Sequence, residues 1–223
     1  MLNNINFSLS TDLMDILAAY QIGLLALMRK VTREANLFVD KLLNEKLPLS
    51  MYFHNFRHTL LVLKAVTEIG NHSGLTDTEK YTLKLSALFH DVGYTQTYMG
   101  HEDASIQIAY DFLKGENVIE EIIDSVCNCI NATKFPQKPD NMLGMIICDA
   151  DFYHFSLVDY PIYAENLKKE WEENLGIVYS AEQWDMLNLS LLSSHQYFVP
   201  YSRKVFEKGK QLNVKKLLNN SIS

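Results

Sequence analysis

Two adjacent side chains that bind metals, His90 and Asp91, directly follow an apolar run at residues 83–89. The helical spacing of that run, and Gly93 shortly after it, predict that a helix ends at this pair. Adjacent residues on a helix point about 100° apart, so both can reach one ion only from different sides of it. Imidazole and carboxylate groups bind Zn, Mn, Fe, Ni or Mg, so the pair indicates metal-dependent chemistry.

Two further segments carry side chains of the same kind. Residues 52–58 read Tyr-Phe-His-Asn-Phe-Arg-His and place His54 and His58 four positions apart, on one face if the segment is helical. Asp149 and Asp151 end another apolar run, and on a helix their spacing would point them in different directions. Two histidines and two aspartates leave metal positions open for water and a phosphate oxygen, which hydrolysis requires.

The order of His58, then His90 and Asp91, then Asp151 resembles the H…HD…D signature of the HD-domain superfamily of metal-dependent phosphohydrolases. Residues 52–58 are similar to the YHNxxH motif of the cyclic-nucleotide phosphodiesterases, with one phenylalanine inserted after the tyrosine. The resemblance extends over roughly residues 35 to 215 and is nearest to a group of uncharacterised bacterial HD proteins. It implies that these four residues bind one or two divalent ions, either Mn, Fe, Ni, Zn or Mg.

The resemblance also implies a reaction, the hydrolysis of a small phosphoester by metal-activated water. The phosphodiesterase-like segment favours a nucleotide phosphodiester, and His54 would protonate the leaving oxygen. Asp149 would orient a ligand or water, or cap a helix in solvent. Two other functions stay open, a 5′-nucleotidase or general phosphomonoesterase, and a non-catalytic sensor that binds a nucleotide or a metal.

Further site residues follow from position and side-chain type. Asp91 is a catalytic candidate as well as a ligand. Lys134 is a further catalytic candidate that could contact a phosphate, although the end of a helix also favours a lysine. His101 could help hold a second ion or simply begin a helix. The remaining candidates for substrate binding are Asn55, Arg57 and Tyr94, the last by stacking on a nucleobase.

The elements that must position these residues are helices. Apolar residues recur at helical spacing almost throughout, and no run alternates with period two. Thr76 with Glu79 and Ser180 with Gln183 read as capping boxes. We predict an all-α fold with helices at about residues 12–28, 30–46, 55–72, 77–90, 102–114, 118–132, 141–157, 160–174, 181–197 and 202–217.

The chain of 223 residues is predicted to form one domain. Within it we expect an N-terminal helical extension at residues 1–34, the HD catalytic core at 35–160 and C-terminal helices at 161–223. The apolar stretch at residues 13–28 is interrupted by Asp15 and Gln21 and has no basic region before it, so it fits a buried or partner-facing helix. Three cysteines without a CxxC pair fit a reducing compartment, and we expect a cytoplasmic protein.

Charge limits the partners. The formal net charge is −7, so most of the surface would repel a long nucleic acid. A small phosphorylated substrate, most simply a nucleotide, remains compatible because a bound cation can invert the charge of one cleft. No membrane partner is expected, and a homodimer stays open.

Overall fold

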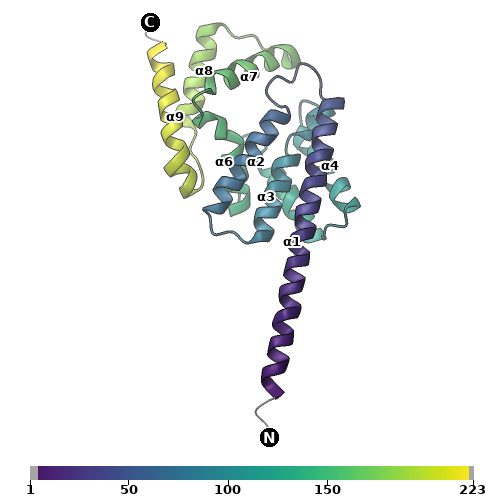
Figure 1. The fold of residues 1–223 in the computed structure, drawn as a ribbon. Helices are drawn as coiled ribbons and strands as arrows, with labels where there is room; N and C mark the ends of the chain where they lie inside the picture. The colour runs from purple at the N-terminus through teal and green to yellow at the C-terminus, as the bar shows by residue number, and fades with distance from the viewer. Residues whose placement is uncertain (1–4, 221–223) are drawn as a thin grey trace.

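The computed structural model describes residues 5–220, and within that range it contains helices and no strand. The all-α prediction is therefore confirmed (Figure 1). The helices are α1 (Ile5–Lys46), α2 (Phe56–Asn71), α3 (Asp77–Phe89), η1 (Val92–Thr95), α4 (His101–Gly115), α5 (Glu120–Ala132), α6 (Met142–Asp151), η2 (Phe152–Ser156), α7 (Tyr160–Leu175), α8 (Ala181–Ser194) and α9 (Pro200–Asn220), where η denotes a 3₁₀ helix. Residues 1–4 and 221–223 of the predicted end segments lie outside this description.

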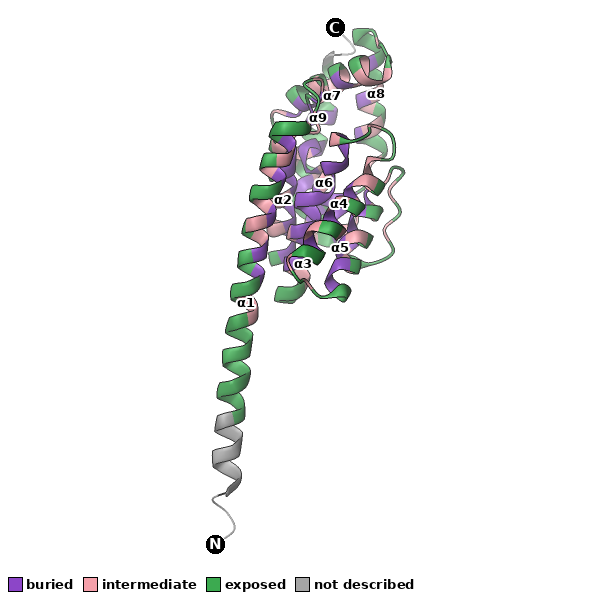
Figure 2. Cartoon of the chain, turned by 90° about the vertical axis from the view of Figure 1, so that its right-hand side faces the viewer, coloured by how far each residue is buried: buried purple, intermediate pink, exposed green. Residues whose placement is uncertain are grey.

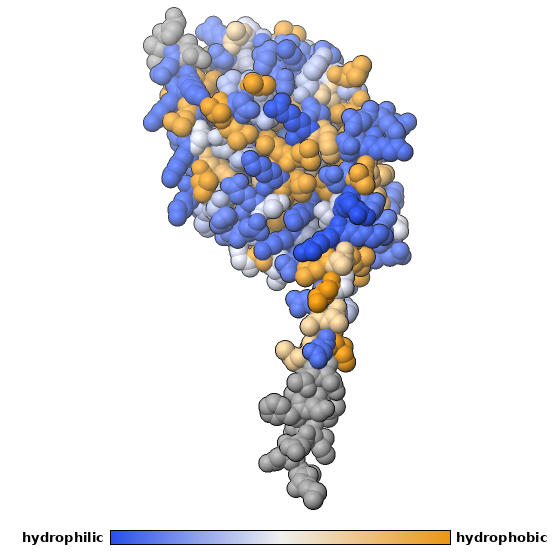
Figure 3. All heavy atoms as spheres, in the orientation of Figure 1, coloured by the Kyte–Doolittle hydropathy of each residue, from blue (hydrophilic) through white to orange (hydrophobic). Residues whose placement is uncertain are grey.

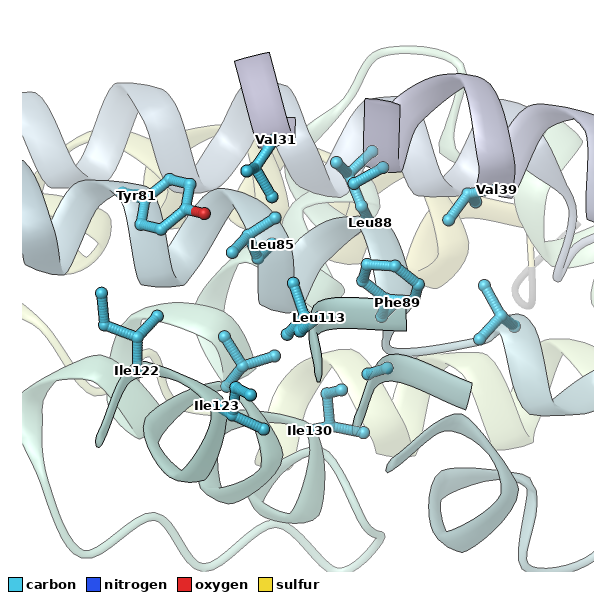
Figure 4. Packing of buried hydrophobic residues seen from close by; sticks show 14 of the residues in the cluster. Val31, Val39, Tyr81, Leu85, Leu88, Phe89, Leu113, Ile122, Ile123 and Ile130 are labelled. Atoms are coloured by element: carbon cyan, nitrogen blue, oxygen red, sulfur yellow. The ribbon is translucent and has the colours of Figure 1, made fainter. Parts of the chain in front are cut away.

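The core is built around α3, which contacts α1, α2, α5 and α6. Figure 4 shows Val31 and Val39 of α1 near the α3 side chains Leu85 and Leu88, with isoleucines of α5 below them. A second cluster joins α2 to α6 and to the start of α9. The site at the end of α3 is thus held by a helix that is buried on most of its faces.

Helix α1 differs from the prediction of two helices at 12–28 and 30–46, because it runs without interruption. Neither glycine nor proline stands at the predicted break, Arg29, so nothing ends the helix there. Only its second half packs on the core, while its first half projects from the body of the molecule (Figures 1 and 2).

The projecting part of α1 carries hydrophobic side chains, which Figure 3 shows as orange and tan spheres below the main body. Leu13 is 57% exposed, Ile16 65% and Tyr20 72%. The prediction that this segment is buried within its own chain is therefore wrong. A partner-facing role stays a prediction. Across the described residues, no helix combines the length and the hydrophobicity needed to cross a bilayer.

The predicted helix at 181–197 ends earlier, at Ser194, because Asp149 holds the following backbone in another conformation. The carboxylate of Asp149 is fully buried and accepts hydrogen bonds from the amides of Phe198 at 2.7 Å and Val199 at 3.0 Å. Burial raises the pKa of Asp149 to about 6. The expected role of Asp149, beside a ligand or as a solvated cap, is thus replaced by the anchoring of the segment that leads into α9.

This anchoring predicts a stability effect for Asp149→Ala. Both amides would lose their acceptor inside the protein, so the free energy of unfolding should fall by about 1–3 kcal/mol. Urea unfolding followed by circular dichroism measures it. The control is Asp103→Ala, which breaks only an exposed ion pair with Lys134 and should cost less than about 1 kcal/mol. Equal losses in the two variants would contradict the anchoring role.

Candidate metal centre

The start of α2 and the C-terminal ends of α3 and α6 meet at one place and bring four potential ligand side chains together. His58 lies in the first turn of α2, whose start is fixed by the Asn55 side chain, which accepts a hydrogen bond from the amide of Arg57 at 3.0 Å. His90 is the C-cap of α3 and Asp91 follows it. Asp151 is the last residue of α6. Residues 93 positions apart in sequence, His58 and Asp151, thus become neighbours.

The distances between these groups are those of a ligand set. The Nε2 atom of His58 lies 3.1 Å from Oδ1 of Asp151, and Nε2 of His90 lies 3.3 Å from Nε2 of His58. One ligand atom from each of these three residues lies within 4.8 Å of the others. Asp91 adds Oδ2, which is 3.1 Å from Nε2 of His90 and 3.4 Å from Nε2 of His58.

Two observations show that the residues fit a divalent cation. The Nδ1 atom of His90 lies 2.9 Å from the carbonyl oxygen of Ala87, which can only accept a hydrogen bond, so a neutral His90 presents a free Nε2 lone pair to the cluster. The Oδ2 atom of Asp91 is buried and has no hydrogen-bond partner. A cation would satisfy both atoms.

The carboxylates are held in the charged form that binds metals. Burial alone would raise the pKa of Asp91, but the charge that His90 carries when protonated, 3.1 Å from Oδ2, lowers that pKa below the ordinary carboxyl value. The pKa of Asp151 is lowered in the same way against burial, first by the hydrogen bond with His58. Two ionised carboxylates in one buried place favour the binding of a cation.

His54 lies beside this cluster and is paired with a residue that the sequence analysis missed, Glu170 of α7. Nδ1 of His54 contacts Oε1 of Glu170, and the other carboxylate oxygen accepts from the amides of Phe53 at 2.8 Å and His54 at 3.0 Å. Glu170 is fully buried. One signal for Glu170 was present in the sequence. It lies three residues after Leu167, on the apolar face of the helix, where a single acidic residue is unusual.

The pairing changes the proton affinity of His54. Burial disfavours the charged imidazolium, but the hydrogen bond and the charge of Glu170 outweigh it and raise the pKa of His54 above the ordinary value. The Nε2 atom lies on the other side of the ring, 3.4 Å from the hydroxyl of Tyr94. His54 is thus a proton donor in chemical terms, and it lines the same cavity as Asp91 and Asp151.

His101 and Tyr94 complete the wall next to Asp91. The Nε2 atom of His101 lies 3.6 Å from Oδ1 of Asp91, and the Tyr94 ring stacks on His101 at 3.7 Å and on His54 at 4.4 Å. Gly93 allows this approach, because a Cβ atom there would lie 1.9 Å from the carbonyl oxygen of His101. The Tyr94 ring, predicted to stack on a nucleobase, contacts two histidines of the protein.

Three predicted residues are not brought to the wall of the cavity. The Nζ atom of Lys134 is 2.6 Å from Oδ1 of Asp103 at the surface. Asn55 caps α2, and its Nδ2 donates to the carbonyl of Tyr52 at 2.8 Å. The guanidinium carbon of Arg57 lies 5.7 Å from the centre of the Tyr163 ring. None of the three is among the residues that line the cavity, so the structure gives them local roles at the ends of helices and on the surface.

Two residues that the sequence analysis did not assign to the site hold Asp151 in place. Gln137 Nε2 lies 3.2 Å from the second carboxylate oxygen of Asp151, and His154 Nδ1 lies 3.1 Å from its backbone oxygen. Burial lowers the pKa of His154 to about 3, so that its imidazole is neutral. The contact with Gln137 orients the carboxylate through Oδ2 and leaves Oδ1 for the cluster, while His154 contacts the backbone of the same residue.

The cluster opens into a cavity of about 480 Å³. Asp91, Asp151, His54 and His101 form one end of it. Side chains of α7 and α8 form the other end.

The comparisons with known proteins agree with this geometry. Residues 55–156 match the family model of the HD domain. No curated protein matches the chain. The matched range contains His58, the adjacent His90 and Asp91, and Asp151, and proteins with HD domains are typically metal-dependent hydrolases. Residues 55–156 of this chain therefore match an HD domain, which confirms the resemblance to the HD-domain superfamily that the sequence motifs indicated.

Proposed function

We propose that this protein is a metal-dependent phosphohydrolase that cleaves a small phosphoester, with a nucleotide phosphodiester as the preferred class. One observation carries the proposal, the presence of a candidate cation-binding cluster and of a histidine paired with a buried carboxylate on the wall of the same cavity. A module that only binds a ligand has no need for a proton donor beside open metal positions.

The ligands in this proposal are His58, His90, Asp91 and Asp151. A divalent ion held by them would polarise the phosphoryl group and lower the pKa of a bound water. The protein supplies two ionised carboxylates and two imidazoles for this task. Elemental analysis identifies the bound ion. The number of ions per chain tests whether His101 helps to hold a second one.

His54 supplies the proton that the leaving group needs. Hydrolysis forms a bond from the oxygen of water to phosphorus and breaks the bond from phosphorus to the leaving oxygen, which takes a proton from Nε2 of His54. Glu170 keeps the imidazole protonated and fixes its orientation through Nδ1. The imidazole regains its proton from solvent after the product leaves.

A diester is favoured over a monoester for two reasons. Residues 52–58 are similar to the motif of the cyclic-nucleotide phosphodiesterases. In addition, no lysine or arginine occurs among the described residues that line the cavity, and a diester carries less negative charge than a monoester. Higher kcat/KM for bis(p-nitrophenyl) phosphate than for p-nitrophenyl phosphate supports the diester, and the reverse order supports a phosphomonoesterase.

The first prediction for this site concerns metal content. The purified protein should contain a divalent metal, and His90→Ala, Asp91→Ala or Asp151→Ala should remove nearly all of it together with the activity, because each removes a direct ligand. Elemental analysis and far-ultraviolet circular dichroism measure metal and helix content. Asp103→Ala, an acidic residue on the surface, is the control and should retain the metal. A fully metallated His90→Ala, Asp91→Ala double variant would exclude this site.

The second prediction concerns His54→Ala. The variant should keep its metal and lose about 10²- to 10⁴-fold in kcat on an ester with an alkoxide leaving group, which needs a proton. On a p-nitrophenyl ester the loss should be much smaller, because p-nitrophenolate leaves without one. His58→Ala should instead depress both substrates together by removing the ion. Equal losses on both esters in metallated His54→Ala would leave the proton-donor role unsupported.

The third prediction uses the raised pKa of His54. Activity on the alkoxide ester requires protonated His54, so it should fall as the pH rises through that pKa. Glu170→Gln removes the charge that raises the pKa, and the alkaline limb of the pH profile should move to lower pH. Glu173→Gln changes an exposed neighbour on α7 that accepts from the hydroxyl of Tyr52, and should leave the limb in place. An unmoved limb in metallated Glu170→Gln contradicts the pairing.

A further inference from the structure

The cavity has two ends of different chemistry. The cluster and His54 lie at one end, and the other end is formed by Leu167, Trp171, Tyr179, Trp184, Leu187 and Leu191, a region that we name the aromatic chamber. Its residues belong to α7, to α8 and to the loop between them, which all follow the matched range of residues 55–156. The chamber is therefore formed by a part of the chain outside the matched HD range.

Three aromatic rings form a corner of the chamber. The rings of Trp171 and Trp184 meet edge to face at 5.6 Å and 90°, and Tyr179 lies 5.6 Å from Trp184 and 6.4 Å from Trp171. Such walls bind flat rings and hydrocarbon groups by apolar burial and stacking.

The polar groups next to the chamber are engaged with each other. The hydroxyl of Tyr160 donates to Oδ1 of Asn188, and Nδ2 of Asn188 donates to the backbone oxygen of Trp184 at 2.7 Å. Asn188 is buried and uses both ends of its amide in these contacts. The amide of Asn188 therefore joins neighbouring residues of the protein, and neither of its ends is left to hydrogen-bond a bound ligand.

Positive charge is also absent from the chamber. None of the described residues lining the cavity is lysine or arginine. Lys168, on α7 itself, lies 3.9 Å from Glu172. A second or third phosphate, or any other anionic group, would enter the chamber without a cation, and burial of an unpaired charge is costly.

We infer that the substrate carries one phosphoryl group at the metal end and an uncharged, largely apolar ring or hydrocarbon group in the aromatic chamber. The inference rests on the proposed phosphoester hydrolysis and restricts its substrates. Among nucleotides it admits those with a single phosphate and excludes nucleoside di- and triphosphates. The chamber selects by apolar area and by charge rather than by hydrogen bonds to a base edge.

Three diesters with the same leaving group test this selection in the metal-loaded enzyme, namely methyl, phenyl and 4-carboxyphenyl p-nitrophenyl phosphate. The phenyl ester should exceed the methyl ester in kcat/KM by about 10- to 100-fold, as expected for burial of one aromatic ring. The carboxyphenyl ester has a similar size but carries a charge, and it should lose most of that gain.

Two variants that add one positive charge, either inside the chamber or on the surface next to it, provide a matched comparison. Leu187→Arg should weaken the phenyl ester and improve the carboxyphenyl ester by about tenfold, because the guanidinium pairs with the carboxylate. Met186→Arg adds the same charge to the preceding residue of α8, which is 61% exposed, and should leave the order of the esters unchanged. Leu187→Ala, a milder change, should reduce the preference for phenyl over methyl.

The selectivity of the chamber and the proposed hydrolysis can be overturned separately. Equal kcat/KM for all three esters, or the same response to Leu187→Arg and Met186→Arg, overturns the chamber inference while hydrolysis itself stands. No hydrolysis of any ester by protein of full metal content overturns the proposed function.

Discussion

The carboxylates of Asp91 and Asp151 face two imidazoles at the point where α2, α3 and α6 meet, and both carboxylates are ionised there. Negative charge removed from water is costly unless cations or strong hydrogen-bond donors compensate it. The rest of the site can be understood from this constraint. Gln137 donates to Oδ2 of Asp151, and His58 and His90 point their Nε2 atoms toward each other. A site with this charge distribution favours a divalent ion.

The same constraint explains why the surroundings are rigid. The α3 helix that ends in His90 is buried among α1, α2, α5 and α6, so its last turn has little freedom to move. The backbone of Gly93 lies directly against the carbonyl of His101, which keeps α4 close to Asp91. Metal sites require ligand positions accurate to a fraction of an ångström, and this packing provides them.

The sequence predicted the helices and the ligand cluster well, because both leave local signals. Helical spacing and capping residues act over a few positions, and a histidine beside an aspartate at the end of an apolar run is a local signal too. Glu170 could not be found in this way, since 116 residues separate it from His54. Asp149 was misread because its partners, Phe198 and Val199, come from a distant segment. For Lys134 the structure shows an ion pair with an exposed aspartate, a partner that the sequence did not indicate, and its contact with a phosphate stays a prediction.

Helix α7 takes part in two tasks at once, since Glu170 holds His54 and Trp171, the next residue, forms the wall of the aromatic chamber. Side chains one position apart on a helix are tied to the same backbone, so a shift that reshapes the chamber also moves the carboxylate. Altered selectivity is therefore easiest to acquire on α8, where Leu187 and Leu191 vary without disturbing the proton donor. In evolution or in engineering, α8 is the helix along which the proposed selectivity can diversify, and α7 is the helix that holds the site to its proposed chemistry.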